Sequence, residues 1–247
     1  MKNSIIINQD ITTKLQKDKY ILLAHNDFTF SSEMQSAMQS LWRDWDNLRA
    51  DKYLQGGASF RSRRFSYCYF LPRTGEILPL PHTAYFQASD INSYAGGIER
   101  DFAPLLDRSL DNIFLLELIR FNFKHFPTTQ EQQENVWKID IHQIRTIATT
   151  EEAGEPAPEG IHHDENEFGC IHLVKYENAT GGVSTAYDNE KNPLESRILR
   201  EPMDSMIIWD PHMMHGISPI YPKIADREAI RDTLLIGYSY MPDLQRP

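Results

Sequence analysis

The feature that most constrains the fold is a series of short strand-like segments in the C-terminal half of the chain. From about residue 136 onward, these segments are separated by turn-rich stretches such as EEAGEPAPEG and ENATGG. Many short strands at close spacing are typical of two-sheet β architectures, in which each sheet covers the apolar face of the other. The expected strands span residues 136–148, 161–164, 170–176, 183–187, 205–209, 216–220 and 231–240.

The first half of the chain mixes helix and strand signals. Residues 31–50 open with Ser-Ser-Glu and carry apolar residues at helical spacing, which predicts a capped amphipathic helix. Residues 106–126 predict a second long helix on the outside of a sheet, and the aromatic-rich residues 59–70 predict a strand. We therefore expect a mainly β fold with flanking helices.

The expected core is a double-stranded β-helix, a jelly roll of the cupin-like kind, over about residues 131–242. A helix-rich N-terminal part of about residues 1–130 would buttress it, and we expect residues 1–247 to form a single domain.

Charge and apolar runs exclude some partners. The formal net charge of −10 argues against nucleic acid or an anionic membrane surface, because a negative field repels phosphates. The N-terminus contains only a three-residue isoleucine run, which is too short for a signal peptide or a membrane span. Cys68 and Cys170 form no paired motif and are expected to be buried free thiols. We expect a cytoplasmic protein.

The segment Ile161-His162-His163-Asp164 carries the strongest chemical signal. On a strand, His162 and Asp164 would share one face because side chains alternate. His215, in the segment WDPHMMHGISPI, is the expected third ligand. Two imidazoles and one carboxylate form the facial triad of non-haem iron(II) oxygenases, which leaves metal positions open for other ligands.

Two neighbouring histidines compete with this assignment. His163 would face the opposite side of an extended segment and is interpreted as a surface residue or a support for the ligands. His212 could replace His215 only if the local backbone were helical, and the surrounding prolines and Gly216 favour a turn that enters a strand. A His-x-Asp spacing alone often arises by chance, and a solvated loop pair is its simpler interpretation.

A second constellation lies on the strand RDTLLIGYSY. Arg231 and Thr233 share a face there, and a guanidinium beside a hydroxyl suits the distal carboxylate of 2-oxoglutarate. The alternative is an ion pair of Arg231 with Asp210 or Glu228.

The strand VWKIDIHQIRTI adds polar residues to an apolar face. Gln143 and Arg145 alternate with isoleucines, and because burying them unpaired is costly we expect them to contact a ligand. His142 falls on the other, wetter face and is expected to be a surface or supporting histidine.

Together these segments resemble a family. About residues 55–240 are similar to the bacterial Fe(II)/2-oxoglutarate-dependent dioxygenases that hydroxylate free L-amino acids, the L-isoleucine 4-hydroxylase-like group. The matching segments are FRSRRFSY, YFQASDINSYAGGIERDF, IHQIR, IHHDENE, IHLV followed by TGG, HGISP and RDTLLIGYSY. The resemblance implies that His162, Asp164 and His215 bind iron and that Arg231 binds 2-oxoglutarate, with O2 as cosubstrate and ascorbate helpful in vitro.

The resemblance also suggests a substrate pocket formed by Gln143, Arg145, Arg61, Glu165 and the loop that begins at Tyr94. In this interpretation Arg145 or Arg61 clamps the carboxylate of the amino acid, and Glu165 or Asp188 accepts its ammonium group.

The expected activity is hydroxylation of an unactivated C–H bond of a free L-amino acid or a close derivative, with conversion of 2-oxoglutarate to succinate and CO2. Desaturation or another oxidative outcome is one alternative, although the presence of Asp164 disfavours halogenation. A non-catalytic, metal-binding, cupin-like sensor is the other. The amino acid, the carbon attacked and the oligomeric state stay open.

Overall fold

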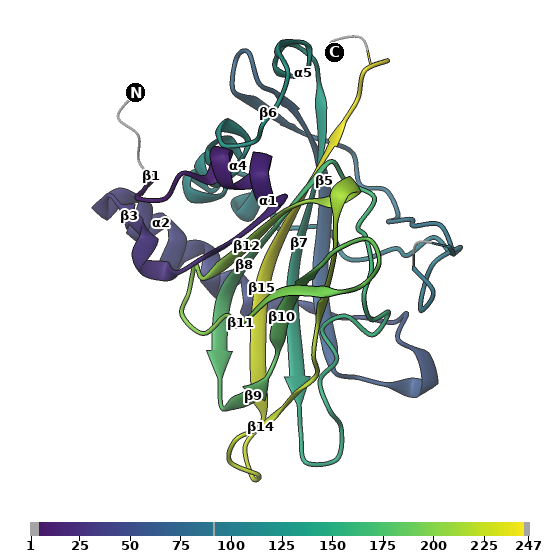
Figure 1. Ribbon diagram of the computed structural model, residues 1–247. Coiled ribbons are helices and arrows are strands. Elements are labelled where there is room, and N and C mark those ends of the chain that lie inside the picture. Colours follow the sequence, from purple (N-terminus) through teal and green to yellow (C-terminus); the bar gives the residue numbers. More distant parts are fainter. Residues whose placement is uncertain (1–4, 91, 245–247) are drawn as a thin grey trace.

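Two antiparallel sheets face each other in the computed structural model, which describes residues 5–90 and 92–244 (Figure 1). The strand order of the major sheet is β2 (Tyr20–Leu23), β12 (Ser205–Trp209), β8 (Phe168–Glu177), β15 (Ala229–Tyr240), β7 (Trp137–Ala148), β5 (Arg61–Leu71) and β4 (Arg49–Ala50), with β6 (Glu76–Pro79) paired to β5. The minor sheet has the order β11 (Pro193–Ile198), β10 (Val183–Tyr187) and β13 (Met214–Ile217). The expectation of a mainly β, jelly-roll core with flanking helices is confirmed.

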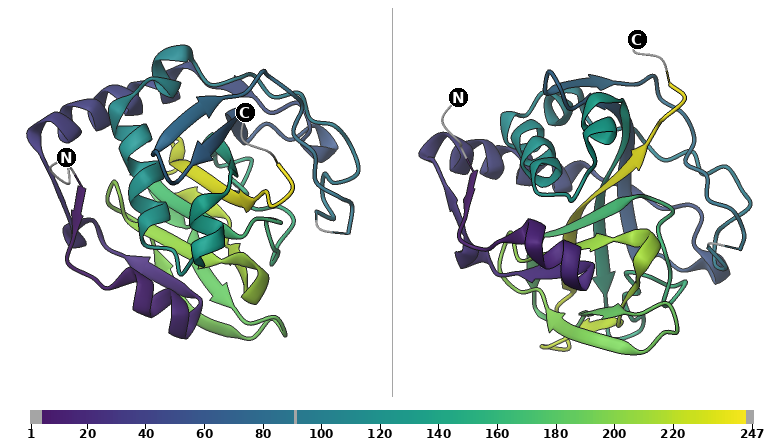
Figure 2. Two further views of the ribbon diagram at one scale, coloured as in Figure 1. Left: turned by 90° about the horizontal axis from the view of Figure 1, so that it is seen from above. Right: turned by 45° about the horizontal axis from the view of Figure 1, so that its top comes forward.

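Further elements surround the two sheets (Figure 2). Two short strand pairs are β1 (Ile5–Ile7) with β3 (Phe28–Phe30), and β9 (Ala179–Gly181) with β14 (Ile220–Pro222). The α-helices are α1 (Ile11–Asp18), α2 (Ser32–Trp42), α3 (Asp107–Leu110), α4 (Ile113–Lys124) and α5 (Gln130–Glu134). No helix within the described ranges is long and apolar enough to cross a membrane.

The largest hydrophobic core lies between the helices and one face of the major sheet. Phe114 and Leu118 of α4 are fully buried there, together with Ile139 and Ile141 of β7 and Leu234 of β15. Burial of such side chains stabilises the fold by about 1.5–3 kcal/mol each. The helices therefore occupy one face of the major sheet, and the opposite face is free to line a pocket.

The predicted helices and strands are mostly present, with shifted ends. The helix predicted over residues 31–50 is α2, capped by the Ser31 hydroxyl, which accepts from the Met34 N–H. The helix predicted over 106–126 is divided into α3 and α4, because the Asn112 side chain caps a new start at Ile113. The segment 161–164 is not a strand, since it makes a single bridge between His162 and His215.

A buried histidine joins the helical layer to the major sheet. The Asn122 amide of α4 donates to His172 Nε2 over 3.1 Å, and His172 Nδ1 donates to Ser205 Oγ over 2.7 Å. The Ser205 hydroxyl donates onward to the Met203 carbonyl over 2.6 Å. This network satisfies a neutral imidazole, with the tautomer assigned from its partners. Burial lowers the pKa of His172 to about 3.

Stability is therefore expected to depend on His172 under acidic conditions. The unfolded chain protonates this imidazole below about pH 6.5 whereas the folded chain does not, so stability is lost as the pH falls from 6.5 toward 3. Between pH 7 and pH 5, we expect the free energy of unfolding of the wild type to fall by about 2 kcal/mol more than that of His172→Leu. Urea denaturation at both pH values measures this difference, and equal losses in the two proteins would contradict it.

Candidate metal centre and its pocket

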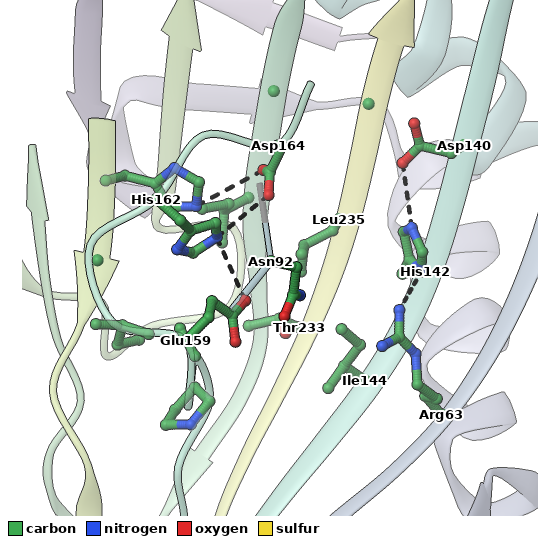
Figure 3. Close-up of a pocket in the computed structure, with 18 of the residues that line it drawn as sticks. Arg63, Asn92, Asp140, His142, Ile144, Glu159, His162, Asp164, Thr233 and Leu235 are labelled. Carbon is green, nitrogen blue, oxygen red and sulfur yellow. Dashed lines mark hydrogen bonds and ion pairs between the residues drawn. The ribbon is translucent and has the colours of Figure 1, made fainter. Parts of the chain in front are cut away.

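Three residues with metal-binding side chains meet between the two sheets. One ligand atom from each of His162, Asp164 and His215 lies within 4.8 Å of the others. His162 Nε2 is 3.3 Å from one oxygen of Asp164, and His215 Nε2 is 3.6 Å from the other (Figure 3). The three groups thus converge on one point, as ligands of a single metal ion do.

A reciprocal backbone bridge sets the separation of the two histidines. The His162 N–H donates to the His215 carbonyl, and the His215 N–H donates to the His162 carbonyl, both over 3.0 Å. His162 Nδ1 donates to the Gly160 carbonyl over 2.9 Å, which leaves Nε2 free to bind a metal. His215 comes from β13 of the minor sheet, so the bridge also ties the loop before Asp164 to that sheet.

Asp210 holds the backbone of the turn that carries the carboxylate ligand Asp164. Its two oxygens accept the backbone N–H groups of Asp164 over 2.9 Å and Glu165 over 3.1 Å. His163 turns away from the centre, and its Nδ1 donates to the Asp210 carbonyl over 2.7 Å. Burial and the neighbouring Asp164 charge raise the pKa of Asp210 to about 8. Reasoning from the sequence considered Asp210 only as a partner for Arg231.

The electrostatics of the triad favour a cation. Burial lowers the pKa of His215 to about 4, so its imidazole is a free base. Burial alone raises the pKa of Asp164, but His215 and His162 outweigh it and hold that carboxylate ionised. Burial also lowers the pKa of His162, whereas Asp164 and Glu159 raise it to about 9. A divalent metal would take the place of the proton that these charges attract.

A pocket extends from the triad along the inner face of the major sheet. Both sheets and the neighbouring loops contribute residues to its lining. Residues of β15 and β7 form its floor: Arg231, Thr233, Leu235 and Gly237 alternate along β15, and Asp140, His142, Ile144 and Thr146 alternate along β7.

The Arg231 guanidinium is a buried cation that lines the same pocket. Arg231 is 3% exposed, and its Nε and Nη2 make no hydrogen bond within the described part of the chain. Burial lowers its pKa to about 10, so it stays charged at neutral pH. The ion pairs considered from the sequence are absent, because Asp210 binds backbone amides and Glu228 is exposed. An unpaired buried charge is costly, so this site fits an anionic ligand.

Two buried hydroxyl groups, those of Thr146 and Ser184, line the same pocket as Arg231. Thr146 lies opposite Arg231 in the pairing of β7 with β15, and Ser184 faces the same pocket from β10. Neither hydroxyl has a hydrogen-bond partner among the described residues, although both are buried. Buried polar groups normally have partners, so a ligand carboxylate near Arg231 would satisfy these hydroxyls as well. Thr233, the expected companion of Arg231, also lines the pocket.

The substrate residues expected from the sequence divide into two groups. Arg61 and Tyr94 line the pocket. Gln143 is fully buried on the helix-covered face, and Arg145 on that same face donates to both oxygens of Asp232 over 2.8 and 2.7 Å. Glu165 is exposed in a turn with φ 64° and lies outside the pocket. The assignments of Gln143, Arg145 and Glu165 to the pocket were wrong.

The reason is that both faces of β7 are buried. The isoleucines lie on the face that packs against the helices, and the more polar face of the strand lines the pocket. His142 is on that face: its Nε2 is 3.2 Å from Asp140, and its Nδ1 accepts from Arg63 (Figure 3). Burial lowers the pKa of His142 to about 4. The alternation of Asp140, His142 and Thr146 was the signal that could have identified this face.

Comparison with known proteins gives consistent matches. A model of the 2OG-Fe dioxygenase family matches residues 42–237. The chain is 25% identical to an L-isoleucine-4-hydroxylase of Bacillus thuringiensis, over 97% of this chain and 98% of that protein. It is 24% identical to a 3(1)-hydroxy-L-isoleucine 4-dioxygenase of Pantoea ananatis, over 85% of this chain and 84% of the other.

Solved structures share the fold. The structure of IDO from Bacillus thuringiensis superposes with a TM-score of 0.79 at 21% identity, covering 94% of this chain and 98% of that chain. A bsmA homolog from Methylobium petroleophilum superposes with a TM-score of 0.82 at 23% identity, covering 93% of this chain and 91% of that chain.

The geometry of the triad predicts which histidine binds the metal. We expect Asp164→Ala and His215→Ala to weaken the binding of Fe(II), or of Mn(II) as its substitute, at least about tenfold. His212→Ala is the matched control, since His212 is exposed and lies outside the pocket. Titration with Mn(II) followed by electron paramagnetic resonance measures the affinities. Loss of metal binding in His212→Ala, with His215→Ala unaffected, would reverse the assignment.

Proposed function

The chain belongs to the 2OG-Fe dioxygenase family, and we propose that within this family it hydroxylates an unactivated C–H bond of a free L-amino acid or a close derivative. Enzymes of this family use Fe(II), 2-oxoglutarate and O2. One relative is named as a hydroxylase of L-isoleucine and the other as a dioxygenase of 3(1)-hydroxy-L-isoleucine, which supports an amino acid as the substrate of this chain.

One observation carries the proposal most strongly. The pocket that contains the triad also contains the Arg231 guanidinium and the hydroxyls of Thr146 and Ser184, which have no hydrogen-bond partner in the described part of the chain. These groups fit a carboxylate that enters from outside the chain, and a metal-binding cavity with no further ligand would not need them. We therefore assign Arg231, together with Thr233 and Thr146, to 2-oxoglutarate.

The proposed roles follow from this placement. His162, Asp164 and His215 would hold iron and leave its remaining positions facing the pocket. When bound, iron and 2-oxoglutarate supply the oxidising chemistry, in which O2 is consumed, 2-oxoglutarate becomes succinate and CO2, and one oxygen atom goes to the substrate. Leu235 and Ile144, on the floor between Arg231 and the far wall, would exclude water from the reacting carbon.

We also propose that the whole chain acts as one catalytic domain. Helix α4 and the major sheet share one hydrophobic core, and β2 from the N-terminal part forms an edge of that sheet through its pairing with β12. The residues that hold the pocket thus depend on packing contributed by both halves of the chain.

A panel assay tests the proposed reaction. Purified protein with Fe(II), ascorbate, 2-oxoglutarate and one L-amino acid at a time is expected to release succinate with at least one aliphatic amino acid. Mass spectrometry should then find a product heavier than that amino acid by one oxygen atom. A product lighter by two hydrogens would indicate desaturation, and no release with any free amino acid would contradict a free amino acid substrate.

The assignment of Arg231 makes a separate prediction. Arg231→Gln should raise the KM for 2-oxoglutarate at least about thirtyfold, because the carboxylate loses a buried cationic partner. Arg227→Gln is the matched control, because Arg227 is an exposed arginine a few residues earlier in the chain. Mn(II) affinity should be unchanged in both variants. An unaltered KM in Arg231→Gln would remove this residue from the 2-oxoglutarate site.

A further inference from the structure

A second group of buried cations lies on the wall of the pocket that β5 contributes. Arg61 and Arg63 lie on β5 and Arg100 on the loop that follows β6, and they are 6%, 6% and 2% exposed. All three line the pocket, and we call them the arginine cluster. Asp51 is the only carboxylate among the described residues that forms an ion pair with the cluster, at 2.8 Å from Arg61 Nε and 3.9 Å from Arg63 Nη1.

The other contacts of the cluster orient its guanidinium groups without neutralising them. Arg100 Nη2 donates to Gln87 Oε1 over 2.7 Å, and its guanidinium lies 4.8 Å from the Tyr85 ring centre. Arg63 Nη2 donates to His142, and its guanidinium lies 4.0 Å from the Phe102 ring centre. Neutral amides, imidazoles and aromatic rings add no negative charge, so the cluster keeps an excess of positive charge. The Nε atoms of Arg63 and Arg100 are buried without a partner among the described residues.

A lone carboxylate lies on the metal side of the same pocket. Glu159 stands on the loop before His162, its side chain is 14% exposed, and its Oε1 is 3.5 Å from His162 Nε2. It makes no other ion pair and no hydrogen bond within the described residues. Although it is close to His162, it is not part of the group of ligand atoms that the triad forms. Its carboxylate is therefore available to a ligand in the pocket.

The two charged features line the same pocket. Figure 3 shows Glu159 beside His162 and pointing toward Asn92 and Thr233, with Arg63 on the far side of Ile144. A small ligand between them would meet positive charge at one end and negative charge at the other.

The charge balance of the pocket limits the net charge of that ligand. Among the described residues, the arginines and carboxylates that line the pocket or pair with its lining are equal in number: Arg61, Arg63, Arg100 and Arg231 against Asp51, Asp140, Glu159 and Asp164. The charge of Fe(II) is matched by the two carboxylates of 2-oxoglutarate. A further ligand without net charge keeps this balance, whereas a ligand with an extra carboxylate would not.

We propose that Glu159 accepts the ammonium group of the amino acid substrate and that the arginine cluster binds its carboxylate, an arrangement that suits an uncharged side chain. This inference rests on the proposed function and names the residues that orient the substrate. Carboxylate and ammonium are then both held by charge-assisted hydrogen bonds, and the side chain is left to lie between Glu159 and the floor of β15 and β7.

Ligand analogues test the proposal on the unaltered protein. The full chain is loaded with Fe(II) and 2-oxoglutarate without O2, and calorimetry measures binding of L-isoleucine, L-isoleucine amide, 3-methylpentanoate and L-glutamate. L-Isoleucine carries both charged groups, L-isoleucine amide lacks the carboxylate, and 3-methylpentanoate lacks the ammonium group. L-Glutamate adds a second carboxylate. Each of the three analogues is expected to bind about tenfold or more weakly than L-isoleucine. If another aliphatic amino acid gives the highest turnover in the panel assay, that amino acid, its amide and its deamino analogue replace L-isoleucine, L-isoleucine amide and 3-methylpentanoate in these measurements.

Variants assign each charge to its residue. Glu159→Gln should weaken the binding of L-isoleucine about tenfold and leave the affinity for 3-methylpentanoate unchanged. Arg100→Gln should weaken the binding of both ligands and leave the affinity for L-isoleucine amide unchanged. Glu155→Gln, on the same loop but outside the pocket, and the exposed Arg49→Gln are matched controls and should bind as the wild type does.

The outcomes separate the two proposals. If no amino acid binds or is turned over, the proposed function itself fails. If L-isoleucine is bound and hydroxylated, but its amide binds equally well or Glu159→Gln behaves like Glu155→Gln, the function stands and the orientation is wrong. Mn(II) affinity measured on Glu159→Gln provides a further check, because a large loss would make Glu159 a metal ligand and overturn its assignment to the ammonium group.

Discussion

The major sheet is covered on both faces, and the two faces are covered in different ways. One face packs against α2 and α4, where Ile139, Ile141 and Leu234 exclude water by hydrophobic contact. The other forms the floor of a polar pocket, where Arg231 and Thr146 are buried with polar atoms that have no hydrogen-bond partner among the described residues. A sheet stabilised on one face by a large apolar core can hold costly polar groups on the other, and the site depends on this asymmetry.

The metal centre depends on a few backbone contacts between segments far apart in the chain. The reciprocal bridge of His162 with His215 fixes the imidazoles, and the buried Asp210 carboxylate holds the turn that carries Asp164. The triad is thus positioned by a loop that is tied to β13 on one side and to the end of β12 on the other. Such support keeps the ligands in place before a metal arrives.

The fold class could be predicted from local alternation and spacing, and the expected ligands His162, Asp164 and His215 lie in one pocket with Arg231. The assignment of Gln143 and Arg145 failed for a nonlocal reason: alternation identifies two faces of a strand, but only the packing of α4 decides which face is covered. Glu159, Arg63 and Arg100 come from three separate segments, and their relation to one another depends on tertiary contacts that no single motif records. The break of the helix at Asn112 was readable from its capping residue.

The place of β15 in the sheet has a consequence for how the protein is made. This strand follows almost all of the described chain, yet it lies in the middle of the major sheet between β8 and β7. A ribosome must therefore release the chain beyond residue 240 before the two halves of the sheet can join, and until then β7 and β8 each carry an open edge. Strand pairings between residues so far apart in the sequence form slowly, and until they form the unpaired strand edges can pair with other chains. The strand that brings Arg231 and Thr233 to the pocket is thus also the one whose pairing ends the period of greatest risk of aggregation.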